Sequence, residues 1–137
     1  EAGYAPRRQQ GERTRLVDSR NAARVHFESV PLGNEALIGT PDTAFAALDR
    51  VLDRARACVA AELLGVITEA FERTVAYLKE RVQFDVPIGS FQALQHRAAH
   101  LFGEIELLRS LVLAACVTLD KSPDAAGTSV SAAKYKA

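Results

Sequence analysis

A long stretch without proline constrains this chain more than any other feature, because it predicts one helix much longer than a small domain is wide. Residues 42–86 contain no proline, and apolar side chains recur there at steps of three and four residues, the period of one helix face. From residue 41 to residue 82 the helix would be roughly 60 Å long. Such a helix needs long helical neighbours. The positions on this face are Phe45, Leu48, Leu52, Ala55, Val59, Leu63, Val66, Ala70, Thr74 and Tyr77.

A second helical pattern covers residues 91–119, with Ser90 as its expected N-cap and Lys121-Ser122-Pro123 as its end. Residues 81–92, RVQFDVPIGSFQ, separate the two patterns and contain proline and glycine, which predicts a turn. We therefore expect two antiparallel helices that meet at this corner. A third helix is expected after Pro123.

The N-terminal part has a different pattern. Residues 1–24 carry six arginines against three acids with little apolar periodicity, which is typical of a solvated arm. Residues 14–17 and 23–30 alternate between apolar and polar side chains around a DSRN turn, which predicts a β-hairpin. Residues 31–39 read as a loop, after which Thr40 is the expected cap of the long helix and Pro41 its first residue.

Composition narrows the range of partners. Lys plus Arg equals Asp plus Glu at 17 each, so no overall charge favours nucleic acid or an anionic membrane. No run of about eighteen apolar residues predicts a membrane span, and no signal peptide is recognisable, so a soluble cytoplasmic protein is expected.

Cys58 and Cys116 lie in apolar helical pattern, which predicts reduced core thiols. Both ends of the chain look cut, which suggests a fragment of a larger protein.

The corner is the first candidate site. Arg81, Gln83, Phe84 and Gln92 could bind an anionic ligand that contains an aromatic ring, because a guanidinium pairs with phosphate through two parallel hydrogen bonds. A purely structural corner is an equally good interpretation of the pattern alone.

Other polar residues have simpler interpretations beside the functional ones. Asp53 and Arg56 are spaced for an ion pair on one helix face. Glu62 lies in an apolar run, so it has a partner or acts as a site acid. His96, His100 and Glu104 share a helix face, but no HExxH motif, further ligand or cysteine pair accompanies this group, and we predict no metal site. Loops of the GxSxG, GxxxxGK and GxGxxG types do not occur in the chain.

Residues 60–115, AAELLGVITEAFERTVAYLKERVQFDVPIGSFQALQHRAAHLFGEIELLRSLVLAA, resemble the acyl-CoA dehydrogenase family, and the corner with FQALQHR is similar to that of bacterial members. The preceding ARVHFESVPLGNEALIG resembles the end of the family's middle β-domain. The resemblance implies a mainly α fold. Residues 1–39 would end the β-domain, and residues 40–137 would form the first two and a part helices of the C-terminal four-helix bundle.

The resemblance also implies a function. The full-length protein would be an FAD-dependent acyl-CoA dehydrogenase, which oxidises an acyl-CoA to the trans-2-enoyl-CoA and passes electrons to an electron-transferring flavoprotein. Arg81, Gln83 and Phe84 match residues that reach the FAD pyrophosphate of a neighbouring subunit, and Gln92 matches another FAD contact. Asp53 and Arg56 match a pair that lines the acyl-CoA pocket near the thioester and pantetheine. A dimer or tetramer is expected.

Two residues depart from the family pattern. Asp85 stands where the family usually has glycine; aspartate tolerates a left-handed conformation, but its charge opposes a pyrophosphate. Ala55 occupies the position of the catalytic glutamate in some members, and in most members that base lies beyond residue 137, so none is expected in this chain. The alternatives are a non-catalytic helical assembly subunit and a plain helical interaction module without flavin.

Overall fold

The computed structural model of the chain describes residues 9–15, 21–40 and 42–137, in two compact units of residues 1–41 and 42–137. In the first unit, strands β1 (Gln9–Arg15) and β2 (Asn21–Phe27) pair antiparallel, with Glu12 opposite Arg24. A short 3₁₀ turn, η1 (Asn34–Ala36), follows.

The predicted hairpin is present, but its bounds were wrong. β1 begins at Gln9, inside the segment expected to be a solvated arm, and β2 ends at Phe27 rather than at residue 30. Ser29 has a φ of 49°, a left-handed conformation that does not continue a strand. Val17, which the sequence placed in the first strand, lies outside the described residues.

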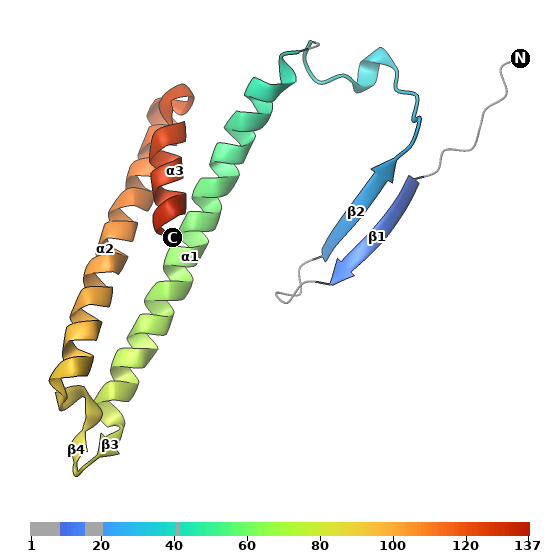
Figure 1. Cartoon of the computed structure of the whole chain (residues 1–137). Helices are drawn as coiled ribbons and strands as arrows, with labels where there is room; N and C mark the ends of the chain where they lie inside the picture. Colours follow the sequence, from blue (N-terminus) through green and yellow to red (C-terminus); the bar gives the residue numbers. More distant parts are fainter. Residues whose placement is uncertain (1–8, 16–20, 41) are drawn as a thin grey trace, which may run out of the picture. The chain divides into compact units, whose positions relative to one another are not determined.

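The second unit is built on α1 (Ala44–Glu80) and α2 (Gln92–Lys121), which lie side by side and antiparallel as predicted (Figure 1). With 37 residues, α1 is roughly 55 Å long. The short strands β3 (Val82–Gln83) and β4 (Val86–Pro87) and the 3₁₀ turn η2 (Ile88–Ser90) join them at one end. Near the other end, η3 (Pro123–Ala125) leads into α3 (Gly127–Lys136), which packs against both long helices.

Both predicted helix caps were wrong. Thr43, not Thr40, precedes α1, because Asp42 has a φ of 68° and helical geometry begins only after it. Phe91, not Ser90, precedes α2. The Ser90 hydroxyl instead donates a hydrogen bond to the carbonyl oxygen of Pro87 at 2.7 Å, inside the turn η2. The predicted end of α2 at Lys121 is confirmed.

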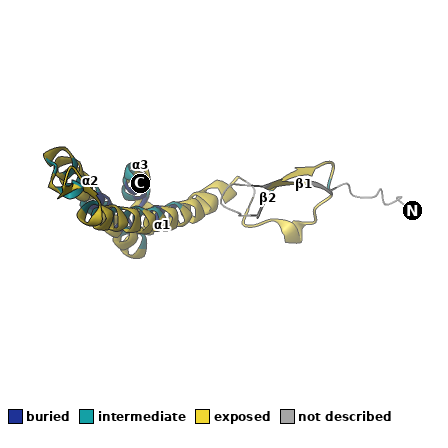
Figure 2. Ribbon diagram, turned by 90° about the horizontal axis from the view of Figure 1, so that it is seen from below, coloured by how far each residue is buried: buried dark blue, intermediate teal, exposed yellow. Residues whose placement is uncertain are grey.

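The core lies where the three helices meet, and alanines dominate it. Small side chains let helix backbones approach closely, so a helix as short as α3 can pack against two longer ones. Elsewhere most residues of α1 and α2 are exposed (Figure 2). The buried cluster consists of Ala57, Ala60, Leu108, Val112, Ala115, Ala126, Val130 and Ala133.

Part of the apolar surface of the helical pair is open. A groove of about 360 Å³ lies between α1 and α2 on the corner side of the core, and apolar side chains such as Phe71, Leu78 and Leu101 line it. The prediction that Cys58 and Cys116 are core thiols was wrong, because both are exposed, one on each long helix. In the part of the chain that the structure describes, no helix is long and apolar enough to cross a membrane.

Candidate functional site

A tight β-hairpin forms the corner between the long helices. Val82 pairs with Pro87 and Gln83 with Val86, which leaves Phe84 and Asp85 as a two-residue loop. Their φ angles are 55° and 64°, so both are left-handed, as a type I′ turn requires. Asp85 therefore occupies the conformation that glycine adopts most readily and that aspartate tolerates. The ring of Phe84 at the tip is 86 % exposed and meets the ring of Phe91 edge-on, with centroids 6.1 Å apart.

Backbone contacts fix the corner against both helices. The amide of Arg81 donates to the Tyr77 carbonyl at 2.9 Å, and the Arg81 carbonyl accepts from the Ile88 amide at 2.8 Å. At Gly89 the turn passes so close to α1 that a β-carbon there would lie 2.8 Å from the carbonyl oxygen of Leu78. Gln95 donates from its side chain to the Gly89 carbonyl at 3.0 Å. Only glycine fits this crossing without a shift of the backbone.

The four predicted corner residues all lie at this end of the helical pair. Arg81 follows the last residue of α1, Gln83 is in β3, Phe84 is at the hairpin tip, and Gln92 is the first residue of α2. All four are exposed, and within the described residues the guanidinium of Arg81 forms no ion pair. Among the described residues, the corner thus presents the guanidinium of Arg81 without an ion pair, and amide groups, with the carboxylate of Asp85 in the same turn.

The second predicted pair, Asp53 and Arg56, forms an ion pair. Nη1 of Arg56 donates to Oδ1 of Asp53 at 2.8 Å. The Asp53 side chain is only 10 % exposed, whereas that of Arg56 is 41 % exposed. A β-carbon at Gly127, the first residue of α3, would lie 3.6 Å from the other Asp53 oxygen. Asp53 is therefore covered by the start of α3, and Arg56 faces outward.

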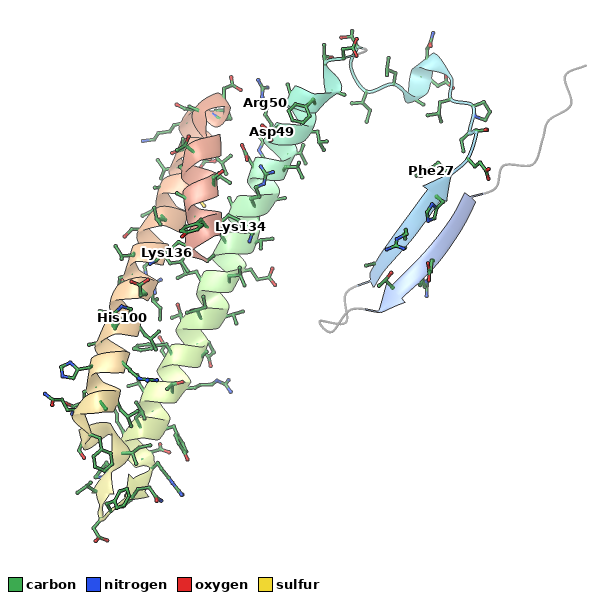
Figure 3. All side chains as sticks on the ribbon, in the orientation of Figure 1. Phe27, Asp49, Arg50, His100, Lys134 and Lys136 are labelled. Carbon is green, nitrogen blue, oxygen red and sulfur yellow. The ribbon has the colours of Figure 1, made fainter. Side chains whose placement is uncertain are left out.

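Sequence reasoning missed a third member of this group. Oδ1 of Asp49 lies 3.7 Å from the same Nη1 of Arg56, and Figure 3 shows Asp49 near the N-terminal end of α1. The spacing of residues 49, 53 and 56 places all three side chains on one helix face. The contact between Asp49 and Arg56 could therefore have been predicted from the helical spacing.

The structure does not bring the two predicted sites together within one chain. Arg56 and Arg81 are separated by most of the length of α1, roughly 38 Å at 1.5 Å per residue. The Asp53–Arg56 pair lies beside α3, and the corner lies at the opposite end of the helical pair (Figure 1).

The remaining candidates have structural explanations. Glu62 is exposed on α1 and is not unpaired, which agrees with the interpretation that it has a partner. Lys136 in α3 pairs with Glu104 in α2, and this hydrogen bond, followed by the charge of Lys136, lowers the pKa of Glu104. Among the described residues, no group of three or more His, Cys, Asp or Glu side chains is placed to hold a metal ion.

Comparison with known proteins identifies the family. The family model described as "Acyl-CoA dehydrogenase, C-terminal domain" matches residues 45–137, which is more than half of the chain. The chain belongs to the acyl-CoA dehydrogenase family. This membership confirms the resemblance that the sequence suggested, and the long antiparallel helices confirm the predicted fold class.

Individual relatives support the same assignment. The chain is 38% identical over 99 residues to the probable acyl-CoA dehydrogenase YngJ of Bacillus subtilis, covering 72% of this chain and 26% of that protein. It is 47% identical over 66 residues to the acyl-CoA dehydrogenase IpdE2 of Mycobacterium tuberculosis, covering 48% of this chain and 21% of that one. The chain therefore spans about a quarter of the length of these relatives.

Solved structures give the same result for the fold. A variant of the Tcur3481–Tcur3483 steroid acyl-CoA dehydrogenase superposes with a TM-score of 0.73 at 36% identity, over 93% of this chain and 33% of that one. A glutaryl-coenzyme A dehydrogenase reaches a TM-score of 0.82 over 95% of this chain and 33% of its own, and at 24% identity it supports the fold alone.

Proposed function

We propose that the full-length protein is an FAD-dependent acyl-CoA dehydrogenase that oxidises an acyl-CoA to the trans-2-enoyl-CoA. Family membership is the observation that carries this proposal. In the reaction, a base would remove a proton from the α-carbon, and a bound FAD would supply the acceptor for the hydride from the β-carbon. Residues 45–137 would contribute contacts to both ligands rather than the base itself.

The corner suits a flavin diphosphate in most respects. Arg81 offers a guanidinium with no ion pair among the described residues, and Gln83 and Gln92 offer amides at the same end of the helical pair. Hydrogen bonds from an arginine to phosphate are charge-assisted and stronger than neutral ones. The exposed ring of Phe84 adds an apolar contact. Asp85 works in the opposite direction, because its carboxylate repels a diphosphate.

For acyl-CoA we propose the Asp53–Arg56 pair, with Arg56 as the exposed member. The separation of roughly 38 Å between this pair and the corner supports an oligomer, in which the corner of one subunit completes the flavin site of another. The open apolar groove between α1 and α2 also supports burial against further protein, because monomers rarely leave large apolar patches exposed. A dimer or tetramer fits both observations.

We propose the base and the electron acceptor from the family pattern. Ala55 has no proton-accepting group, so we propose that a glutamate outside residues 1–137 is the base. We further propose an electron-transferring flavoprotein as the acceptor and the cytoplasm as the compartment.

The visible absorbance spectrum of the full-length protein tests this function. Purified protein, reconstituted with FAD, should show flavin bands that bleach when a saturated acyl-CoA of suitable chain length is added under anaerobic conditions. The matching 2-enoyl-CoA, which has no hydride to give, is the control and should leave the bands oxidised. Protein that never acquires flavin bands would contradict the proposal.

Asp85 and Ala55 favour a second candidate, a non-catalytic assembly subunit of a heteromeric acyl-CoA dehydrogenase-like complex. Such a subunit would be colourless alone but would raise the activity of an active partner chain on co-expression. Flavin retention together with bleaching by the protein alone rejects this candidate.

A further inference from the structure

Two carboxylates compete for one guanidinium at the Asp53–Arg56 pair. Oδ1 of Asp53 lies 2.8 Å and Oδ1 of Asp49 lies 3.7 Å from the same nitrogen, Nη1 of Arg56. The shorter contact is a hydrogen bond, whereas the longer one is beyond hydrogen-bond range and is an electrostatic contact only. Arg56 is thus held firmly on one side and loosely on the other.

Burial separates the two carboxylates in the same way. Asp53 is only 10 % exposed and is covered by the start of α3, whereas the Asp49 side chain is 53 % exposed. Breaking a buried charge-assisted hydrogen bond leaves an unpaired charge and is costly. Separating two charges at an exposed site costs little, because water solvates both. Arg56 can therefore leave Asp49 much more easily than it can leave Asp53.

We propose that Asp49 is a displaceable partner of Arg56, which an acceptor oxygen of acyl-CoA replaces on binding, while Asp53 is a positioning residue that keeps the guanidinium in place. This inference rests on the proposed acyl-CoA function of Arg56. It assigns opposite effects to two aspartates that are one helical turn apart. Asp49 weakens ligand binding by competing for Arg56, and Asp53 strengthens it by orienting Arg56.

The ligand group is an oxygen that accepts hydrogen bonds from a guanidinium. It comes from one of two sources, a carbonyl of the thioester or pantetheine arm, or a phosphate of the nucleotide part. Two probes separate these sources, butyryl-CoA and S-butyryl-pantetheine, which lacks the phosphates. An effect of Asp49 on both probes assigns the oxygen to the carbonyl side, and an effect on butyryl-CoA alone assigns it to a phosphate.

The experiment measures the dissociation constant of each probe for the flavin-loaded full-length protein by titration of the flavin spectrum under conditions without turnover. Asp49→Asn should tighten binding about two- to fivefold, the range expected for an exposed charge pair. Asp53→Asn should weaken it about tenfold, since a partly buried charge-assisted hydrogen bond is lost. Asp124→Asn is the matched control, because it removes one acid that pairs with Arg50 on the surface and does not contact Arg56.

The outcomes distinguish the inference from the function. If Asp49→Asn and Asp124→Asn change the dissociation constant equally, the effect comes from net charge alone and the inference is overturned. Weaker binding of the probe by Asp49→Asn would also overturn it. If Asp53→Asn fails to fold, the comparison of Asp49→Asn with Asp124→Asn still decides the role of Asp49. Absence of binding in the parent protein as well as in every variant would overturn the proposed function itself.

Discussion

Lys136, the last residue of α3, donates a hydrogen bond to Glu104 in the middle of α2 and so fastens the end of a ten-residue helix to a thirty-residue one. The pairing joins residues 32 apart in the sequence and closes the three-helix arrangement. The strength of this hydrogen bond depends on the negative charge of Glu104, so a change of pH tests its contribution to stability.

Acid should weaken this contact. The pKa of Glu104 lies below its ordinary value of 4.5 in the folded protein, chiefly because of the hydrogen bond from Lys136. A lowered pKa gives a stabilisation that is fully present above 4.5 and is lost as the pH falls through the folded-state pKa. Urea unfolding at a series of pH values should show a smaller loss of stability with acid in Glu104→Gln than in the parent chain. Glu72 is an exposed glutamate on α1, and Glu72→Gln is the control. Its unfolding free energy should fall with acid as steeply as that of the parent chain.

Gly89 should not tolerate a side chain. Gly89→Ala places a β-carbon 2.8 Å from the Leu78 carbonyl oxygen, so the turn has to move away from α1. Overpacking of this kind costs about 1 to 3 kcal/mol of unfolding free energy. Gly103→Ala is the control, because nothing lies within 4 Å of its β-carbon in the middle of α2. That substitution should stabilise the helix by about 0.5 to 1 kcal/mol. Similar thermal shifts in both variants would contradict the tight crossing at Gly89.

Arg81→Ala in the full-length protein should lower FAD affinity, because it removes a charge-assisted hydrogen bond worth about 1.5 to 3 kcal/mol. Equilibrium dialysis against FAD measures the loss. Arg73→Ala serves as a control, since Arg73 lies on the exposed face of α1 and pairs with Glu69. Unchanged flavin retention in Arg81→Ala would remove Arg81 from the flavin site.

Asp85→Asn should raise FAD affinity if the corner binds the diphosphate. Asparagine adopts the same left-handed conformation, so the turn is kept and only the negative charge is lost. Asp85→Val is the conformational contrast, because a β-branched residue is strained at a φ of 64° and should destabilise the corner instead. Equal FAD affinity in the Asp85→Asn variant and the parent would place the carboxylate away from the phosphates.

The existence of the long helices was predictable because apolar side chains repeat over many turns. The packed face of α1 was predicted wrongly, because Leu48, Val59 and Val66 are exposed, whereas Ala57 and Ala60 are buried.

The predictions of helix starts were wrong, because a single residue decides where a helix begins. The side chains of Thr40 and Ser90 suit helix caps. However, α1 begins only after the left-handed backbone at Asp42, and the Ser90 hydroxyl donates its hydrogen bond to Pro87 instead of capping α2. The hairpin in the corner was not predicted, because a type I′ turn is usually marked by Asn-Gly or Asp-Gly, and a phenylalanine such as Phe84 is unusual at its first central position.

The candidate site was predictable in its residue types but not in its surroundings. Helical spacing placed Asp53 and Arg56 on one face, yet only the packing of α3 showed that Asp53 is buried and Arg56 is not. Likewise, periodicity put Cys58 and Cys116 in apolar surroundings, and the three helices of this unit leave both thiols exposed. Which flank of a helix is covered depends on its neighbours rather than on its own sequence.

The distance along α1 between Arg56 and Arg81 has a genetic consequence under the proposed function. A subunit that carries Arg81→Ala would spoil the flavin site of its neighbour while keeping its own Arg56, and a subunit that carries Arg56→Ala would do the reverse. Mixed oligomers of the two defective chains would then contain some centres with both arginines intact. Two alleles that are each inactive alone should therefore restore activity when they are expressed together.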